Sequence, residues 1–275
     1  MDHKVEHEMV EDNGSGNGAP LGRQITVTMS PDQYERLFFQ PSAPRGDLSK
    51  RLANPTLLGL LGFLIPYTST VLCLCGFQGA AAPASLAGLS GDYYFLGAIA
   101  MNIAGVAEFV LGNTFPFAVF VIYGCHWGSL AYTQDPIHNI SAAFTGAGGL
   151  TGAPYNASQG FHNVTMTLVS FTIFIATFRV NAFFTLTFFG LIGLFAFTAA
   201  ADFAIPHAKT AADVLHIEHL IHIAGGFGFI GLVCGWYLAI LTSCAAVNIP
   251  CPLPVFDLSN VVFPGRNKQT VEKHA

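Results

Sequence analysis

The histidine-rich run before the last apolar segment holds residue types that could bind a metal ion or a proton. His216, Glu218, His219 and His222 lie close together along the chain. Histidines at three-residue steps turn by about 60° each around a helix, and the order H-E-x-x-H, which presents two ligands on one face, is missing. The run therefore predicts no metal site. Two interpretations stay open: a pH-responsive outer vestibule, since histidine titrates near neutrality, or a hydrogen-bonded helix start in which Glu218 reaches His222.

Glu108 is a second residue whose side chain could take part in chemistry, because it is a carboxylate near the end of a long apolar run. A charge at the centre of a membrane helix costs about 2.5 to 3.5 kcal/mol on insertion scales, so it needs a reason. A structural role, in which Glu108 reaches the inner membrane surface or pairs with Arg179, and a functional role both stay open. Tyr123 places a hydroxyl in the middle of the next apolar run, where it needs a partner or a wet pore.

Six apolar runs must position these groups. Hydrophobic residues make up 52% of the 275 residues and charged residues 10%, which is typical of a polytopic membrane protein and fits a soluble one poorly. Each run is close to the ~20 residues that cross a bilayer as a helix. The expected spans are 55–77, 92–111, 115–133, 161–179, 181–203 and 217–243. We therefore predict an all-α polytopic membrane protein with six transmembrane helices in antiparallel hairpins, and one longer connection over 134–160.

The two ends of the chain are polar. Residues 1–50 are charged, rich in Gly and Asn and interrupted by Pro, which predicts a mostly disordered cytoplasmic tail with one short helix after Ser30. Residues 51–247 are expected to form the six-helix transmembrane domain. Residues 248–275 begin with a Pro-punctuated stretch and are expected to form a second, initially extended, cytoplasmic tail.

The distribution of basic residues predicts the orientation. Of the eleven Lys and Arg, six precede the first span, Arg179 lies between the fourth and fifth, three follow the sixth, and only Lys209 lies on the other side. The positive-inside rule then places both termini in the cytoplasm. The sequons at Asn139, Asn156 and Asn163 fall on the predicted outer side, around the connection between the third and fourth spans, and are candidates for glycosylation.

The first span opens with Asn54-Pro55. Pro in the first turn of a helix loses no hydrogen bond, and Asn before it can cap the free N–H groups. Gly59 and Gly62 remove side-chain bulk from one side of this helix, and Phe63 places a ring beside the gap. This side either packs against another helix or lines a pore.

Other kinds of chemistry have no candidate residues. The six cysteines lie mostly in apolar runs and are interpreted as small buried residues. No nucleotide-binding glycine loop, Walker motif or nucleophile elbow is visible. The residues alone therefore indicate a six-helix channel or carrier for a small solute, without enzyme activity, a cofactor, a metal ion or a nucleic-acid partner.

Several motifs match one known family of membrane proteins. Residues 54–60 read NPTLLGL and match the signature N-P-x-P-L-G-L, with Leu57 in place of the second Pro. Further matches are AGVAEFVLGNTF at 104–115, YGCHW at 123–127, FRVN at 178–181, FFGLIGLFAF at 188–197 and HIAGGFGFIGLVCGWYLA at 222–239. Together the motifs cover all six spans. On them the chain resembles the acetate uptake transporters, which include bacterial succinate–acetate permeases and fungal acetate permeases once named as ammonia exporters.

The resemblance implies a homo-hexamer in membrane lipid, with one pore per protomer. The Phe, Tyr and Leu that constrict the pore of the family match Phe63, Tyr123 and Leu191. Leu57 departs from the family pattern, because the missing Pro removes a rigid point next to the pore.

The resemblance also implies roles for polar residues. The signature places Asn54, Thr56 and Gly59 at the substrate. The carboxylate of the second span matches Glu108 and the histidine of the sixth matches His222, and these two are the candidates for proton coupling.

Membership of this family implies a plasma-membrane transporter or channel for acetate and similar short monocarboxylates, coupled to protons. Such acids should titrate near the Glu value of about 4.3, so at neutral pH they are anions that cross lipid poorly. An apolar neck would pass a two-carbon chain and reject hydrated cations and large solutes. Two alternatives stay open: export of ammonium or ammonia, and a non-transporting sensor of acetic acid that acts through the N-terminal tail.

Overall fold

The computed structural model describes residues 51–258 and 261–262. Six helical spans that are long and apolar enough to cross a membrane lie in this part of the chain, which confirms the predicted fold class. The N-terminal tail, with the short helix expected after Ser30, lies outside the described residues, as does most of the tail that follows residue 258.

Five spans are built on one long α-helix each, and the second is built from several helical segments. The single helices are α2 (Thr56–Leu74), α5 (Thr114–Gln134), α6 (Ala153–Thr177), α7 (Ala182–Ala204) and α8 (Ala211–Ala246). The second span joins η3 (Ala84–Leu89), α3 (Ser90–Asp92), the π-helical η4 (Tyr93–Ala100) and α4 (Met101–Val110). Short helices in the connections are η2 (Phe77–Gly79), η5 (Ile140–Ala147), η6 (Gly149–Thr151) and η7 (Ile205–His207).

Two helices begin well before the expected spans. Helix α6 starts at Ala153 rather than at residue 161, and α8 starts at Ala211 rather than at residue 217. In α8 the reason is a capping box, in which the hydroxyl of Thr210 accepts from the Asp213 amide and the Asp213 carboxylate accepts from the Thr210 amide. Hydropathy finds the lipid-facing part of a helix, whereas the cap decides where the helix begins.

The start of α2 shows how the signature of the first span is used. The side-chain oxygen of Asn54 accepts from the Thr56 amide at 2.9 Å, so Asn54 bonds a free N–H of the first turn as predicted, but the helix begins at Thr56 and Pro55 is its N-cap residue. A Cβ on Gly59 would collide with the ring of Phe120 in α5, and one on Gly62 would lie 3.0 Å from the carbonyl oxygen of Leu96. The glycine side of α2 therefore packs against other helices, and contact of Gly59 with substrate stays a prediction.

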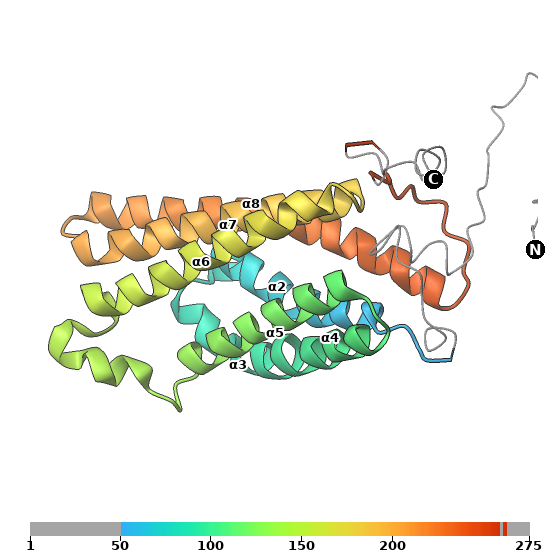
Figure 1. Cartoon of the computed structure of the whole chain (residues 1–275). Coiled ribbons are helices and arrows are strands. Elements are labelled where there is room, and N and C mark those ends of the chain that lie inside the picture. Colours follow the sequence, from blue (N-terminus) through green and yellow to red (C-terminus); the bar gives the residue numbers. More distant parts are fainter. Residues whose placement is uncertain (1–50, 259–260, 263–275) are drawn as a thin grey trace, which may run out of the picture.

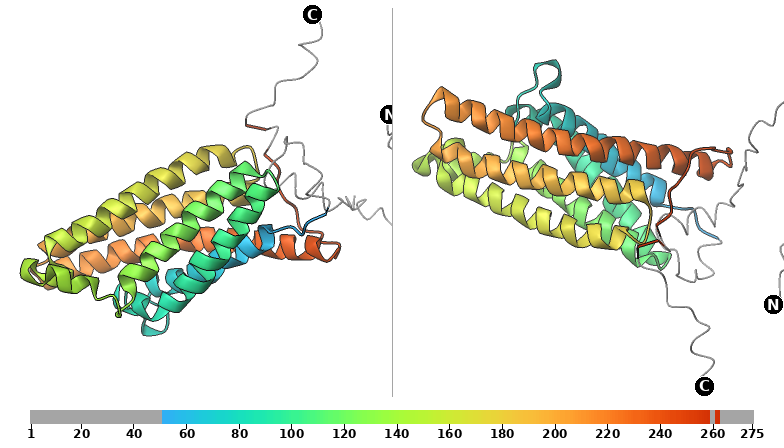
Figure 2. Two further views of the ribbon diagram at one scale, coloured as in Figure 1. Left: turned by 60° about the horizontal axis from the view of Figure 1, so that its bottom comes forward. Right: turned by 90° about the horizontal axis from the view of Figure 1, so that it is seen from above.

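The six spans run side by side along one bundle (Figure 1 and Figure 2), and their contacts arrange them as a ring. Helix α6 packs on α7, α7 on α8, α8 on α2, α2 on the second span, and the second span on α5. Sequence neighbours therefore pack as expected, and the first and last spans close the ring. Helices α5 and α6 are the exception, because their backbones approach less closely than those of the other neighbouring spans.

The segment after α8 returns to the end of the ring where α7 begins. Its described residues, 247–258 and 261–262, contain no helix. The segment pairs with the connection before α7 through hydrogen bonds from the Leu258 amide to the Val180 carbonyl and from the Ala182 amide to the Phe256 carbonyl, at 3.1 and 3.0 Å. The Tyr237 hydroxyl donates to the Pro254 carbonyl at 2.8 Å. This segment was predicted to be extended. Its contacts show that it lies against the N-terminal end of α7.

The packing of α7 on α8 generates a stability prediction. A Cβ on Gly190 would lie 2.6 Å from the Phe227 carbonyl oxygen and 2.8 Å from the Gly231 amide nitrogen, whereas one on Gly226 meets nothing within 4 Å. We expect Gly190→Ala to lower stability by about 1 to 3 kcal/mol, because the backbone of α8 must move.

The matched control is Gly226→Ala, which adds the same methyl group at an open helical position and should leave stability equal or slightly higher. The measurement is thermal unfolding of the purified variants in detergent. Equal melting temperatures for the two variants would contradict the packing described for α7 and α8.

Candidate functional site

A wide cavity of about 500 Å³ occupies the middle of the ring. Its walls come from α2, α5, α6 and α7, and one end is formed by residues 82–87 and 134–141. At its other end lie Phe63, Tyr123 and Leu191, each from a different span. We call the end formed by these two loop segments the connection end, because the connection between α5 and α6 lies there.

A narrow cavity of about 30 Å³ lies beyond these three residues. Its walls are apolar and aromatic side chains of α2, α4, α5, α7 and α8, among them Phe120, Phe188 and Leu238. The residues that line both cavities are Phe63, Tyr123 and Leu191. They form a neck between the two cavities.

The neck is closed in this structure. The exposed fraction is 9% for Phe63, 1% for Tyr123 and 2% for Leu191. Phe63 and Tyr123 meet edge to face with ring centroids 6.1 Å apart, and Phe63 stacks on Tyr67 at 4.7 Å. These ring contacts hold the neck in one arrangement, so a solute passes only if a ring or the leucine moves.

The Tyr123 hydroxyl has the partner that its buried position requires. It shares a hydrogen bond of 2.7 Å with the Ser170 hydroxyl on α6, and Ser170 in turn donates to the Met166 carbonyl. The bond crosses the interval between α5 and α6. It fixes the tyrosine ring in the neck and joins the two helices there.

Glu108 lies in a hydrogen-bond network at the Asn54 end of the ring. Its two carboxylate oxygens accept from the Thr56 hydroxyl and from the Asn113 amide, both at 2.6 Å. The side chain is fully buried, so the interpretation in which it reaches the membrane surface is wrong. The network joins the capped start of α2 to the end of α4 and to the start of α5.

The sequence-predicted polar residues of this network do not line a cavity. Asn54 is exposed and caps α2, and Thr56 is buried with its hydroxyl on Glu108. Neither residue, nor Glu108, is among those that line the wide or the narrow cavity. Contact of Asn54 and Thr56 with substrate stays a prediction. Leu57, at the first turn of α2, is half-buried.

His222 lies apart from the cavities. Its side chain is exposed on α8, near Gly76, and it lines neither cavity. The other members of the run, His216, Glu218 and His219, are exposed as well. The helix start is indeed hydrogen-bonded, but through Thr210 and Asp213 rather than through Glu218.

Two histidines that the sequence did not single out lie in the wide cavity. His126 Nδ1 and His162 Nε2 are 2.9 Å apart in a hydrogen bond, and the rings stack with centroids 5.1 Å apart and an interplanar angle of 8°. His126 is one turn along α5 from Tyr123, and that spacing is the signal by which it could have been found. His162 comes from α6, where nothing in the sequence marks its partner.

A second polar pair lies in the wall of the same cavity. The Asn163 amide donates to the Asp202 carboxylate at 2.8 Å and joins α6 to α7. Trp127 lines the cavity as well, and its buried indole N–H has no hydrogen-bond partner among the residues that the structure describes.

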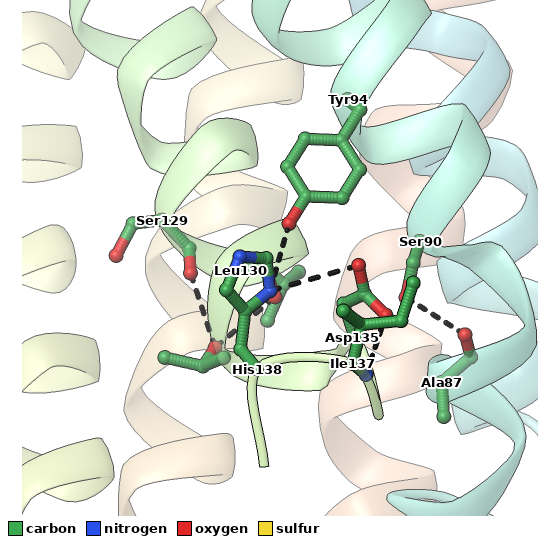
Figure 3. Close-up of polar contacts among 9 residues, drawn as sticks. Ala87, Ser90, Tyr94, Ser129, Leu130, Asp135, Ile137 and His138 are labelled. Atoms are coloured by element: carbon green, nitrogen blue, oxygen red, sulfur yellow. Dashed lines mark hydrogen bonds and ion pairs between the residues drawn. The ribbon is translucent and has the colours of Figure 1, made fainter. Parts of the chain in front are cut away.

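Figure 3 shows the polar contacts at the connection end. Asp135 lines the wide cavity, accepts from the Ile137 amide at 3.0 Å and lies 3.6 Å from His138 Nδ1. The same nitrogen lies 3.3 Å from the Tyr94 hydroxyl of the second span. These contacts attach the segment after α5 to the second span at the connection end of the cavity.

The three sequons differ in accessibility. Asn139 is exposed in the connection. Asn156 is 3% exposed and its amide nitrogen donates to the carbonyls of Leu150 and Gly152, while the amide nitrogen of Asn163 is used on Asp202. A glycan replaces one of the two hydrogens on this nitrogen. Asn156 uses both hydrogens on carbonyl oxygens, whereas Asn163 uses one and keeps the other. Glycosylation of Asn139, Asn156 and Asn163 stays a prediction.

Comparison with known proteins agrees with this architecture. Protein alcS of Aspergillus fumigatus is 32% identical over 240 residues, which cover 85% of this chain and 86% of that protein. The succinate-acetate/proton symporter SatP of Escherichia coli K12 is 31% identical over 185 residues, 67% of this chain and 84% of that protein. The ammonia transport outward protein 3 of Saccharomyces cerevisiae is 26% identical over 223 residues, 77% and 73% of the two chains.

A solved structure resembles this one too. The bacterial acetate channel SatP superposes with a TM-score of 0.52 at 28% sequence identity and covers 74% of this chain and 99% of its own. The model of the GPR1/FUN34/yaaH family matches residues 38–260, which include all six spans. The chain belongs to the GPR1/FUN34/yaaH family.

Proposed function

We propose that this protein carries acetate and similar short monocarboxylates across the plasma membrane, with protons, through the two cavities and the neck. The observation that carries the proposal is that Phe63, Tyr123 and Leu191, from three spans, are the residues that line both cavities. Relatives named as an acetate channel and a succinate-acetate/proton symporter support the choice of solute.

The chemistry of the neck suits a short acid. Two aromatic rings and a leucine offer a solute no replacement for its hydration shell, so hydrated cations are rejected. A two-carbon chain is small enough to pass when one side chain moves, and the neutral acid passes at a lower cost than its anion. The wide cavity is large enough to collect such acids before they reach the neck.

The orientation belongs to the proposal. With both termini in the cytoplasm, as the basic residues favour, the connection end of the ring faces the outside and the wide cavity lies on the outer side of the neck. The exposed Asn139 lies on that outer side, where a glycan can be attached.

A homo-hexamer in lipid is the proposed assembly. The exposed apolar side chains of the second and fourth spans, among them Phe95, Ile103, Leu168 and Phe171, need lipid or neighbouring copies around them. Each protomer encloses its own pair of cavities. In this proposal the pathway therefore runs through a protomer and not between protomers.

Ammonium or ammonia export is the second candidate, because one relative is named for it. Among the described residues that line the two cavities there is no Lys or Arg, so no fixed positive charge of this lining opposes an ammonium ion. Competition distinguishes the two solutes: excess propionate should inhibit uptake of labelled acetate and excess ammonium should not. The reverse result would favour ammonium. A non-transporting sensor would instead give no flux in liposomes.

The neck generates a selectivity prediction. Phe63→Ala and Tyr123→Ala each remove a ring, so longer monocarboxylates such as butyrate should pass several-fold faster while acetate flux is kept or raised. Labelled-acid uptake by proteoliposomes measures both. The matched control is Phe95→Ala, which removes an equally large ring with 67% exposure on the outer surface of the second span. Unchanged exclusion of butyrate in both neck variants would contradict the assignment.

The Glu108 network generates a stability prediction. Glu108→Ala leaves the Thr56 hydroxyl and the Asn113 amide without their acceptor. The free energy of unfolding should fall by roughly 1 to 3 kcal/mol for each group. Glu108→Gln keeps one acceptor and should lose less stability. Thermal unfolding compares both with Glu218→Ala, the same truncation at an exposed site.

Acetate flux of the folded Glu108→Gln variant then tests proton coupling. If Glu108 carries the proton, uptake should lose its dependence on a pH gradient although the variant remains folded. If the dependence is kept, Glu108 holds the inner end of α2 in place and the proton is carried elsewhere.

A further inference from the structure

The pair formed by His126 and His162 lies on the path to the neck. Both rings line the wide cavity, and His126 contacts the aromatic side chains next to the neck, with ring centroids 5.5 Å from Trp127 and 5.1 Å from Phe195. His126 is 8% exposed, and its Nδ1 is used on His162 Nε2. The pair is a buried nitrogen-to-nitrogen contact, which needs a proton between the two rings.

The chemistry of two hydrogen-bonded imidazoles defines what the pair can hold. Each neutral ring has one N–H and one bare nitrogen. The bond between Nδ1 of His126 and Nε2 of His162 uses one of each, so one N–H and one bare nitrogen remain at the two outer positions. A further proton gives the pair one positive charge and an N–H at both outer nitrogens. In this state the pair donates hydrogen bonds from both sides.

The surroundings make this state costly unless an anion is present. A single charge in a largely apolar cavity is unfavourable, whereas a hydrogen-bonded pair of opposite charges costs much less. None of the described residues that line the cavity is Lys or Arg. The two histidines are therefore the groups of this lining that can become cationic when they bind a proton.

The other titratable groups of the wide cavity are two carboxyls and three phenols. They are Asp135, Asp202, Tyr67, Tyr123 and Tyr155. The Asp202 carboxylate accepts from Asn163, and the Asp135 carboxylate lies near His138 at the connection end. The Tyr67 hydroxyl donates to the Gly228 carbonyl, and the Tyr123 hydroxyl is bonded to Ser170. Each of these four has a hydrogen-bond or ion-pair partner, whereas the two histidines are bonded to each other and line a cavity large enough for a small acid.

We propose that the His126–His162 pair is a site at which the wide cavity binds a short carboxylate together with a proton. The inference rests on the proposed function and assigns to that function the place where proton and acid meet. Neither ion binds well alone, because each alone is a buried charge. Together they form a neutral imidazolium–carboxylate pair.

The proton then accompanies the acid through the neck. Transfer from an imidazolium N–H to a carboxylate oxygen breaks the N–H bond, forms an O–H bond, and returns the histidine pair to its neutral form. The neutral acid enters the apolar neck, and a proton from the outer solution reloads the pair. Binding is reciprocal: acetate raises the proton affinity of the pair, and the proton raises its acetate affinity by the same factor.

Acetate binding to the purified full chain in detergent tests the proposal. In weakly buffered solution with a pH indicator, acetate should be bound with uptake of a proton, and its affinity should rise as the pH falls. Coupling between two sites is typically worth about 5- to 150-fold in affinity. His126→Gln and His162→Gln should each lose the proton uptake and most of the pH dependence. His207→Gln, an exposed histidine that lines neither cavity, should keep both.

The outcomes separate this inference from the proposed function. If wild-type proteoliposomes take up no acetate, the proposed function fails. If they do take it up but the wild type binds acetate without proton uptake at any pH tested, the histidine site is overturned, and this result needs no variant to fold. Full proton uptake in both folded glutamine variants would overturn it as well. Thermal unfolding of each variant establishes that it is folded before it is compared.

Discussion

The seam between α5 and α6 is the feature on which the rest of the structure depends. Every other pair of neighbouring spans in the ring packs through close helix contact, with glycines such as Gly62 and Gly190 bringing helices together. At the seam the two helices stand further apart and are joined by side-chain hydrogen bonds, Tyr123 to Ser170 and His126 to His162. In lipid, a ring that packed tightly all round would have no room for a pathway.

The neck and the wide cavity follow from that seam. Tyr123 is held at the neck by a bond that also spans the interval, so the side chain that blocks the pathway is tied to the helix across it. Movement of α6 relative to α5 would therefore change both the neck and the histidine pair one turn away. The Glu108 network has a different place in this arrangement, because it fixes the start of α2 at the opposite end of the ring.

Sequence reasoning found what depends on local composition. Hydropathy predicted the six spans because a helix in lipid must carry mostly apolar side chains. The bond from Asn54 to the first turn of α2 was predictable because it joins residues only two apart. The beginning of α6 was missed, since its first turns are polar. Three features depend on residues far apart in the chain, which no spacing along one helix reveals. They are the burial of Glu108, the contact of Gly59 with Phe120 and the bond between His126 and His162.

The central claim is that solute passes through one neck in each protomer, and filling that neck tests it most directly. Leu191→Trp puts a large ring where the two cavities meet, and Leu186→Trp makes the same change at a site of 43% exposure on the same helix. The measurement is labelled-acetate uptake by proteoliposomes of folded protein. The account predicts uptake near that of empty liposomes for the first variant and wild-type uptake for the second; wild-type uptake by Leu191→Trp would contradict it.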